Sequence, residues 1–104
     1  MFEHLRDDGR YAVLRRMEGE VPGYLSYGAD EGEVLCVFGG IAEAEEFYEL
    51  WRVRIPGEGW GAVQIGGEAL AAVARNFDLV SINPRPTPGE VEYLVPVEDF
   101  VRDL

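Results

Sequence analysis

A run of apolar residues, Val34 to Phe38, is the sequence feature that most restricts how this chain can fold. It has no charged member, and Gly39-Gly40 ends it at once. A half-buried strand would alternate apolar and polar residues, whereas a strand buried on both faces is continuously apolar. We therefore expect residues 34–38 to form a central strand.

The residues after Gly40 repeat with the period of a helix. Apolar side chains recur at intervals of three and four residues, at Ile41, Ala44, Phe47, Tyr48, Trp51 and Ile55. Glutamates at 43, 45, 46 and 49 occupy the remaining face, and Arg52 and Arg54 stand near the end, where the helix dipole favours cations. The pattern predicts a helix that Pro56-Gly57 terminates.

The rest of the chain predicts further strands and helices joined by glycine-rich or proline-rich turns. Strands are expected at 11–17, 24–27, 60–65, 79–82 and 91–95, and helices at 68–75 and after Pro96. The order β-β-β-α-β-α-β-β-α predicts an α+β fold, with a single mostly antiparallel sheet and helices on one face. No repeat or low-complexity segment divides the chain, so residues 1–104 are expected to form one domain.

The net charge of the chain makes some classes of binding partner unfavourable. The chain has twenty acidic and nine basic residues, and all nine basic residues are arginine. Its net charge is therefore −11. Without lysine, the chain has no Schiff-base lysine and no phosphate-loop lysine. A surface this negative repels nucleic acid and anionic lipid, so neither is an expected partner. A basic protein or a cationic ligand would be attracted, although the charge also serves solubility.

The start of the chain and its overall composition suggest a location. The first eight residues carry charges throughout, and no apolar run approaches the roughly 20 residues that a membrane span needs. A cytoplasmic protein is therefore expected. The scarcity of amides and thiols beside many charged residues is typical of a thermophile-like composition.

Metal and cofactor sites are not expected. His4 and Cys36 are the only histidine and the only cysteine, so a zinc cluster and an internal disulfide are both excluded. Cys36 lies in the apolar run, where a thiol is unreactive. Asp30, Glu31 and Glu33 are clustered but lack the glycine-bracketed loop of a calcium site.

No catalytic constellation is found either. Gly39-Gly40 precedes a predicted helix, as in some phosphate sites, but glutamates follow it and no lysine does. Glu45 and Glu49 are four residues apart on an exposed helix face, which favours a solvated stripe over an acid/base pair. Ser26 and Ser81 lie on predicted strands without a nucleophile turn. We therefore expect a protein that is not an enzyme.

The aromatic residues exceed what one small core requires. The excess consists of Tyr11, Tyr24, Tyr27, Trp60 and Tyr93, and arginines at 15, 16 and 85 accompany them. Aromatic side chains and arginine are enriched at protein interfaces. The loop from Asn83 to Gly89 has three prolines and should be stiff. The predicted interaction surface therefore contains Tyr24, Tyr27, Trp60, Asn83, Arg85 and Tyr93.

Three short stretches of the chain resemble the N-terminal domain of the SseB-like family, the enhanced serine sensitivity proteins. They are Val34 to Phe38 with the helix containing Phe47, then Leu79 to Ile82 with Asn83-Pro84, and finally Leu94 to Phe100. The resemblance covers about residues 34–104. It implies an α+β fold and marks no active site.

These observations together predict a non-enzymatic protein-interaction or regulatory module. Its expected partner is another protein or a second copy of the same chain. One alternative is a small-ligand-binding domain with a pocket near Gly39-Gly40 and Asn83. Another is an acidic antagonist of a basic protein, of the kind that neutralises a toxin or nuclease.

Overall fold

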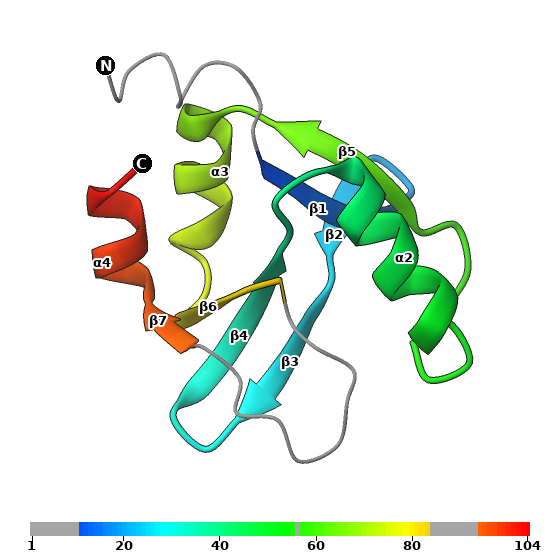
Figure 1. Cartoon of the computed structure of the whole chain (residues 1–104), viewed down its shortest axis with the longest axis horizontal. Helices are drawn as coiled ribbons and strands as arrows, with labels where there is room; N and C mark the ends of the chain where they lie inside the picture. Colours follow the sequence, from blue (N-terminus) through cyan, green and yellow to red (C-terminus); the bar gives the residue numbers. More distant parts are fainter. Residues whose placement is uncertain (1–10, 56, 84–93) are drawn as a thin grey trace.

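The computed structural model describes residues 11–55, 57–83 and 94–104 (Figure 1). The elements in these residues are β1 (Tyr11–Glu18), β2 (Val21–Tyr24), β3 (Ser26–Ala29), β4 (Gly32–Val37), α2 (Ile41–Trp51), β5 (Gly61–Ile65), α3 (Gly67–Ala74), β6 (Leu79–Ile82), β7 (Leu94–Pro96) and α4 (Val97–Arg102). The α+β class is confirmed.

The described strands form two sheets rather than one. The first has the order β2-β1-β5 and is antiparallel throughout. The second has the order β3-β4-β6-β7, in which β4 and β6 run parallel and the other pairs are antiparallel. The parallel pair arises because the chain leaves β4 through α2, β5 and α3 before it returns as β6 (Figure 1). The expectation of a single sheet is therefore wrong.

A bend at Leu25 explains why one sheet becomes two. The Leu25 N–H donates to the carbonyl of Leu14 in β1 at 2.9 Å, and the Leu25 carbonyl accepts from Cys36 in β4 at 3.1 Å. The segment therefore changes partner at this residue, from β1 along β2 to β4 along β3. Two further bonds between Ala12 and Phe38, at 2.9 and 2.8 Å, join the sheets again.

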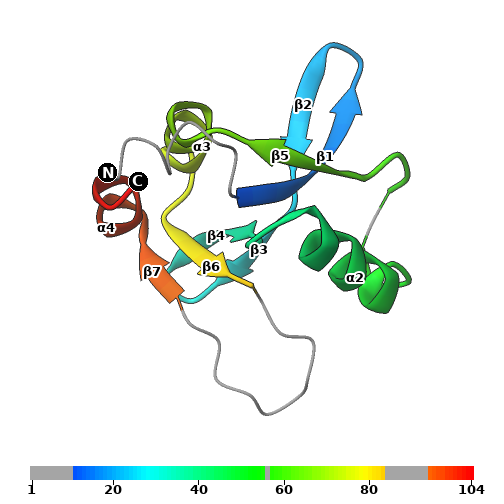
Figure 2. The same ribbon diagram turned by 45° about the horizontal axis from the view of Figure 1, so that its top comes forward.

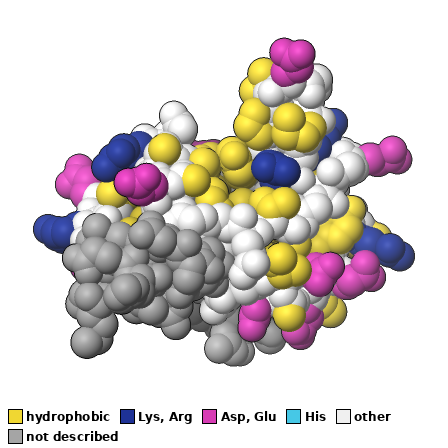
Figure 3. All heavy atoms as spheres, turned by 90° about the horizontal axis from the view of Figure 1, so that it is seen from above, with side chains coloured by type: hydrophobic (Ala, Val, Ile, Leu, Met, Phe, Trp, Pro, Cys, Tyr) yellow, Lys and Arg dark blue, Asp and Glu magenta, His cyan; other side chains and the backbone are white. Residues whose placement is uncertain are grey.

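Beyond this junction the hairpin of β1 and β2 projects from the body of the molecule; we call residues 15–24 the β1–β2 arm (Figures 2 and 3). Gly19 and Glu20 form its turn, and Gly19 has a φ of 67°. A glycine in the left-handed region at the first turn position is characteristic of the tight hairpin turn that matches strand twist.

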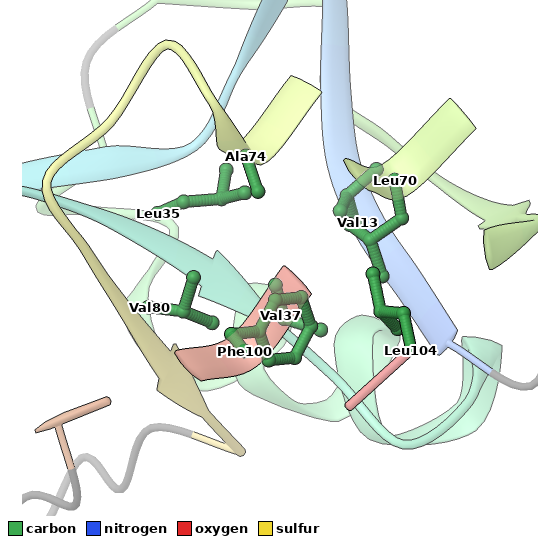
Figure 4. Packing of buried hydrophobic residues seen from close by; sticks show 8 residues of the cluster. All are labelled: Val13, Leu35, Val37, Leu70, Ala74, Val80, Phe100 and Leu104. Carbon is green, nitrogen blue, oxygen red and sulfur yellow. The ribbon is translucent and has the colours of Figure 1, made fainter. Parts of the chain in front are cut away.

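The interior holds two clusters of buried apolar side chains, one on each side of β4. The first joins β1, β4, β6, α3 and α4 and contains Val13, Leu35, Val37, Leu70, Ala74, Val80, Phe100 and Leu104 (Figure 4). The second lies under α2 and contains Ala12, Leu14, Leu25, Cys36, Phe38 and Ala44. Each fully buried large aliphatic side chain stabilises the fold by about 1.5–3 kcal/mol.

The division of β4 between two clusters corrects the expectation of helices on one face. Leu35 and Val37 face α3 and α4, whereas Cys36 and Phe38 face α2. Successive residues of a strand point to opposite sides, so a continuously apolar strand needs cover on both. The run at residues 34–38 thus meets helices on either side.

The predicted elements otherwise lie close to the observed ones. The predicted strand 24–27 is the middle of the bent segment that forms β2 and β3, so four strands precede α2 where three were expected. The predicted helix 41–55 is regular only to Trp51 and continues as turns to Ile55. Of the predicted strand 91–95, residues 94 and 95 lie in β7, and 91–93 lie outside the described residues.

Candidate functional site

The ends of the parallel strands β4 and β6 meet beside the start of α2, the place where α/β sheets often bind ligands. Here Asn83 has a φ of 50° and its Oδ1 accepts a hydrogen bond from the Gly39 N–H at 2.8 Å. Its own N–H donates to the Val37 carbonyl at 2.7 Å. These bonds make Asn83 a link that holds the two strand ends together.

The start of α2 already has a negative neighbour. Glu43 folds back so that one carboxylate oxygen lies 2.8 Å from where a Cβ on Gly40 would be. A carboxylate at this end of a helix is stabilised by the helix dipole, and it repels a second anion. The geometry therefore gives no support to a phosphate site at Gly39-Gly40.

Cys36 and Ser81 are adjacent in the parallel pair of β4 and β6. Their exposed fractions are 2% and 0%. Among the described residues, the Ser81 hydroxyl has no hydrogen-bond partner. Since neither side chain reaches solvent, a substrate could not approach them without an opening of the second cluster.

The predicted interaction residues are not brought together in one place. Tyr24 packs against the first cluster, while Tyr27 and Trp60 pack against the second. All three are partly buried. Arg85 and Tyr93 lie outside the described residues. Asn83 lies where strands β4 and β6 end. The structure thus separates Tyr24 from the pair Tyr27 and Trp60.

Two shallow hollows border α4. One, of about 250 Å³, is lined by Tyr11, Ile82, Val95, Phe100, Asp103 and Leu104. The Tyr11 and Phe100 rings meet edge to face in its wall, with centroids 5.8 Å apart. The other, of about 290 Å³, is lined by Arg75, Val97, Glu98 and Val101. Neither is bordered by Gly39, Gly40 or Asn83, where a pocket was expected.

The β1–β2 arm carries exposed apolar side chains that sequence reasoning missed. Met17 is 51% exposed and Val21 is 67% exposed. Met17 stands opposite Pro22 and Val21 opposite Glu18, and paired residues share a face of the ribbon. The two apolar side chains therefore lie on opposite faces of the arm. The sequence signal that could have predicted their exposure is that Met17 and Val21 flank the turn at Gly19.

One face of the arm combines residue types that protein interfaces favour. Arg15 stands opposite Tyr24 and Met17 opposite Pro22, so all four side chains share this face. Methionine, arginine and tyrosine are enriched at interfaces. In Figure 3 hydrophobic side chains cover much of the arm, with an acidic side chain at its tip. The arm is therefore the candidate interaction surface.

Other kinds of site find no support in the described ranges. Within residues 11–55, 57–83 and 94–104, no three histidine, cysteine or acidic side chains gather as metal ligands would. Of the helices in the described part of the chain, none combines the length and the apolar character needed to cross a bilayer.

No family model matches the chain, and no curated protein is significantly similar to it. The resemblance to the SseB-like family and the expectation of a non-enzymatic role therefore stay predictions.

Proposed function

We propose that this chain is a non-enzymatic protein-interaction or regulatory module that engages a partner protein, or a second copy of itself, through the β1–β2 arm. A single observation carries the proposal: the arm projects from the body and exposes Met17 and Val21 on opposite faces (Figure 2). Exposed apolar side chains on a projecting ribbon contribute nothing to the buried clusters, and their burial in a complex would be favourable.

The test replaces both apolar side chains by serine, as Met17→Ser with Val21→Ser. Sedimentation velocity reports whether the chain associates with itself, and quantitative affinity purification compares the proteins retained by each form. Glu31→Ser is the control, because Glu31 is exposed at the turn between β3 and β4, away from the arm. We expect the arm variant to lose an assembly that the control keeps. Retention of every assembly by the arm variant contradicts the proposal.

A small-ligand-binding domain is the second candidate, and the hollow beside Tyr11 and Asp103 favours it. Its walls are apolar, with a carboxylate and a phenol among the lining residues, which suits a small apolar molecule with a cationic or hydrogen-bonding end. A thermal-shift screen of metabolites tests this function. A stabilisation lost on Asp103→Asn would support it, since ligand binding raises the free energy of unfolding.

A further inference from the structure

The outer face of α2 is a second exposed surface. We use this name for five exposed residues of α2 and for Val53 in the turn after it, which is exposed as well; the five are Ala42, Glu45, Glu46, Glu49 and Leu50. No residue of the β1–β2 arm belongs to it. Acidic, hydrophobic and basic side chains lie next to one another on the right of Figure 3, at the end of the molecule where α2 lies.

The charges of this face repel one another. Glu45 and Glu49 are four residues apart, and Glu46 and Glu49 are three apart, so each pair stands on adjacent turns. Like charges at these spacings destabilise a helix. In the ranges that the structure describes, the ion pairs are Arg16–Glu18 and Arg102–Asp99, and neither neutralises this face.

Two arginines stand at the end of α2. Arg52 is exposed and follows Glu49 by three residues. The Arg54 guanidinium lies 5.0 Å from the centre of the Trp51 ring, as in a cation–π contact. These two positive charges stand against the four negative charges of Glu43, Glu45, Glu46 and Glu49, so the helix and the turn after it keep a net negative charge.

The same face carries two large apolar side chains. Leu50 is 61% exposed and Val53 is 89% exposed. Glu46 and Leu50 are four residues apart and share a face of α2, and Val53 follows three residues later in the turn that continues the helix. Solubility explains the glutamates but not Leu50 and Val53, because exposed aliphatic side chains lower solubility.

We propose that the outer face of α2 docks a cationic amphipathic segment of a partner protein. Lysines or arginines of that segment pair with Glu46 and Glu49, and its apolar side chains cover Leu50 and Val53. Helix α2 has 11 residues, so it presents about 16 Å of length, which a partner helix of about three turns matches. Charge complementarity selects this occupant, since a second copy of the same acidic face would be repelled.

The probe is a synthetic three-turn helical peptide with lysine on one face and leucine on the other. A peptide of the same composition in scrambled order is its control. Fluorescence anisotropy of the labelled peptide gives the dissociation constant at several salt concentrations. We expect the amphipathic peptide to bind more tightly than the scrambled one by about tenfold or more.

Two pairs of variants separate the outer face of α2 from the general charge of the protein. E46Q/E49Q removes two charges from the face, and D30N/E31Q removes two exposed charges from the turn between β3 and β4. We expect about tenfold weaker binding for the first pair and less than about twofold for the second. L50S/V53S keeps the charge and should also weaken binding about tenfold, whereas M17S/V21S on the arm should not.

Three results would overturn the proposal. Equal weakening by E46Q/E49Q and D30N/E31Q would mean that only net charge attracts the peptide. Unchanged binding by L50S/V53S would remove the apolar contact. A chain that sediments as a dimer, and more strongly so in E46Q/E49Q, would make this face a contact between copies. Because M17S/V21S leaves this face intact, failure of the arm and failure of the outer face of α2 are distinguishable.

Discussion

Gly32 shows how strictly one residue can be fixed by its neighbours. Its φ is 141°, which side-chain-bearing residues rarely adopt, and a Cβ there would lie 2.7 Å from the Asp78 Cγ. Asp78 is held in place because its Oδ2 accepts from the Glu33 N–H at 2.9 Å and its N–H donates to the Glu33 carbonyl at 3.0 Å. The turn between β3 and β4 therefore has no room for a methyl group.

We predict that Gly32→Ala lowers the free energy of unfolding by about 3 kcal/mol, through backbone strain and the loss of the Asp78 contacts. Urea denaturation followed by tryptophan fluorescence measures this change. Gly61→Ala is the control, because nothing lies within 4 Å of its Cβ position. Equal stability of the two variants would show that the turn can rearrange without cost.

Substitutions of Asn83 test whether this residue stabilises the fold by linking the ends of β4 and β6. A residue that served only as a contact surface would not affect stability. Asn83→Ala loses the acceptor for the Gly39 N–H and places alanine at a φ of 50°, so the free energy of unfolding should fall by about 1–2 kcal/mol. Asn83→Asp keeps the acceptor and should cost less than about 0.5 kcal/mol, and Asn83→Gly should fall between them. Denaturation of the three variants measures the order. An alanine variant as stable as the original chain would contradict the link.

At the scale of elements, the free edge of β2 is partly blocked by Pro22. The Leu25 N–H bonds to Leu14, and alternate residues of an antiparallel strand face the same neighbour. Counting back from Leu25, Gly23 and Val21 face β1, so Pro22 and Tyr24 face outward. Proline has no N–H, so the outward edge offers one backbone donor in place of two.

We predict that Pro22→Val makes the chain associate with itself more than the original does, because it restores the missing donor on the edge. Sedimentation velocity at increasing protein concentration measures this association. Met17→Val is the matched control, since Met17 stands opposite Pro22 in β1 and its replacement leaves the donors on the edge of β2 unchanged. If both variants sediment as the original chain does, Pro22 is not what protects the edge.

The same scale shows which elements the sequence could predict. The sequence predicts helix α2 because its apolar residues recur every three or four positions. It predicts strand β4 because its apolar residues form an unbroken run. The bend at Leu25 depends on bonds to Leu14 and Cys36, which are distant in sequence, so no local signal announces it. The parallel pairing of β4 and β6 was equally hidden, since an apolar strand suits either direction.

The interaction surface was harder to predict than the fold. Aromatic content indicated that large side chains were in excess, but it does not say on which side of a sheet each one packs. Tyr24 packs against the first cluster, and Tyr27 and Trp60 against the second, because the two sheets diverge at Leu25. The exposure of Met17 and Val21 follows from the projection of the arm, which is a property of the tertiary fold.

At the scale of the whole molecule, net charge should limit stability. Twenty acidic residues stand against nine arginines, and the two ion pairs in the described segments lie on the surface. Exposed pairs of this kind contribute little, so salt has little attraction to weaken and much repulsion to screen.

We predict that sodium chloride stabilises the protein. Raising its concentration from about 0.01 M to about 1 M shortens the Debye length from about 30 Å to about 3 Å. A relief of about 1 kcal/mol would raise Tm by roughly 4–8 °C in a domain of this size. Differential scanning calorimetry measures the shift. The variant E31Q/E58Q should melt higher at low salt and gain less from added salt, because two exposed charges are gone. Equal gains in both proteins would instead mean that salt acts through burial of apolar surface, and a fall in Tm would mean that attractive pairs dominate.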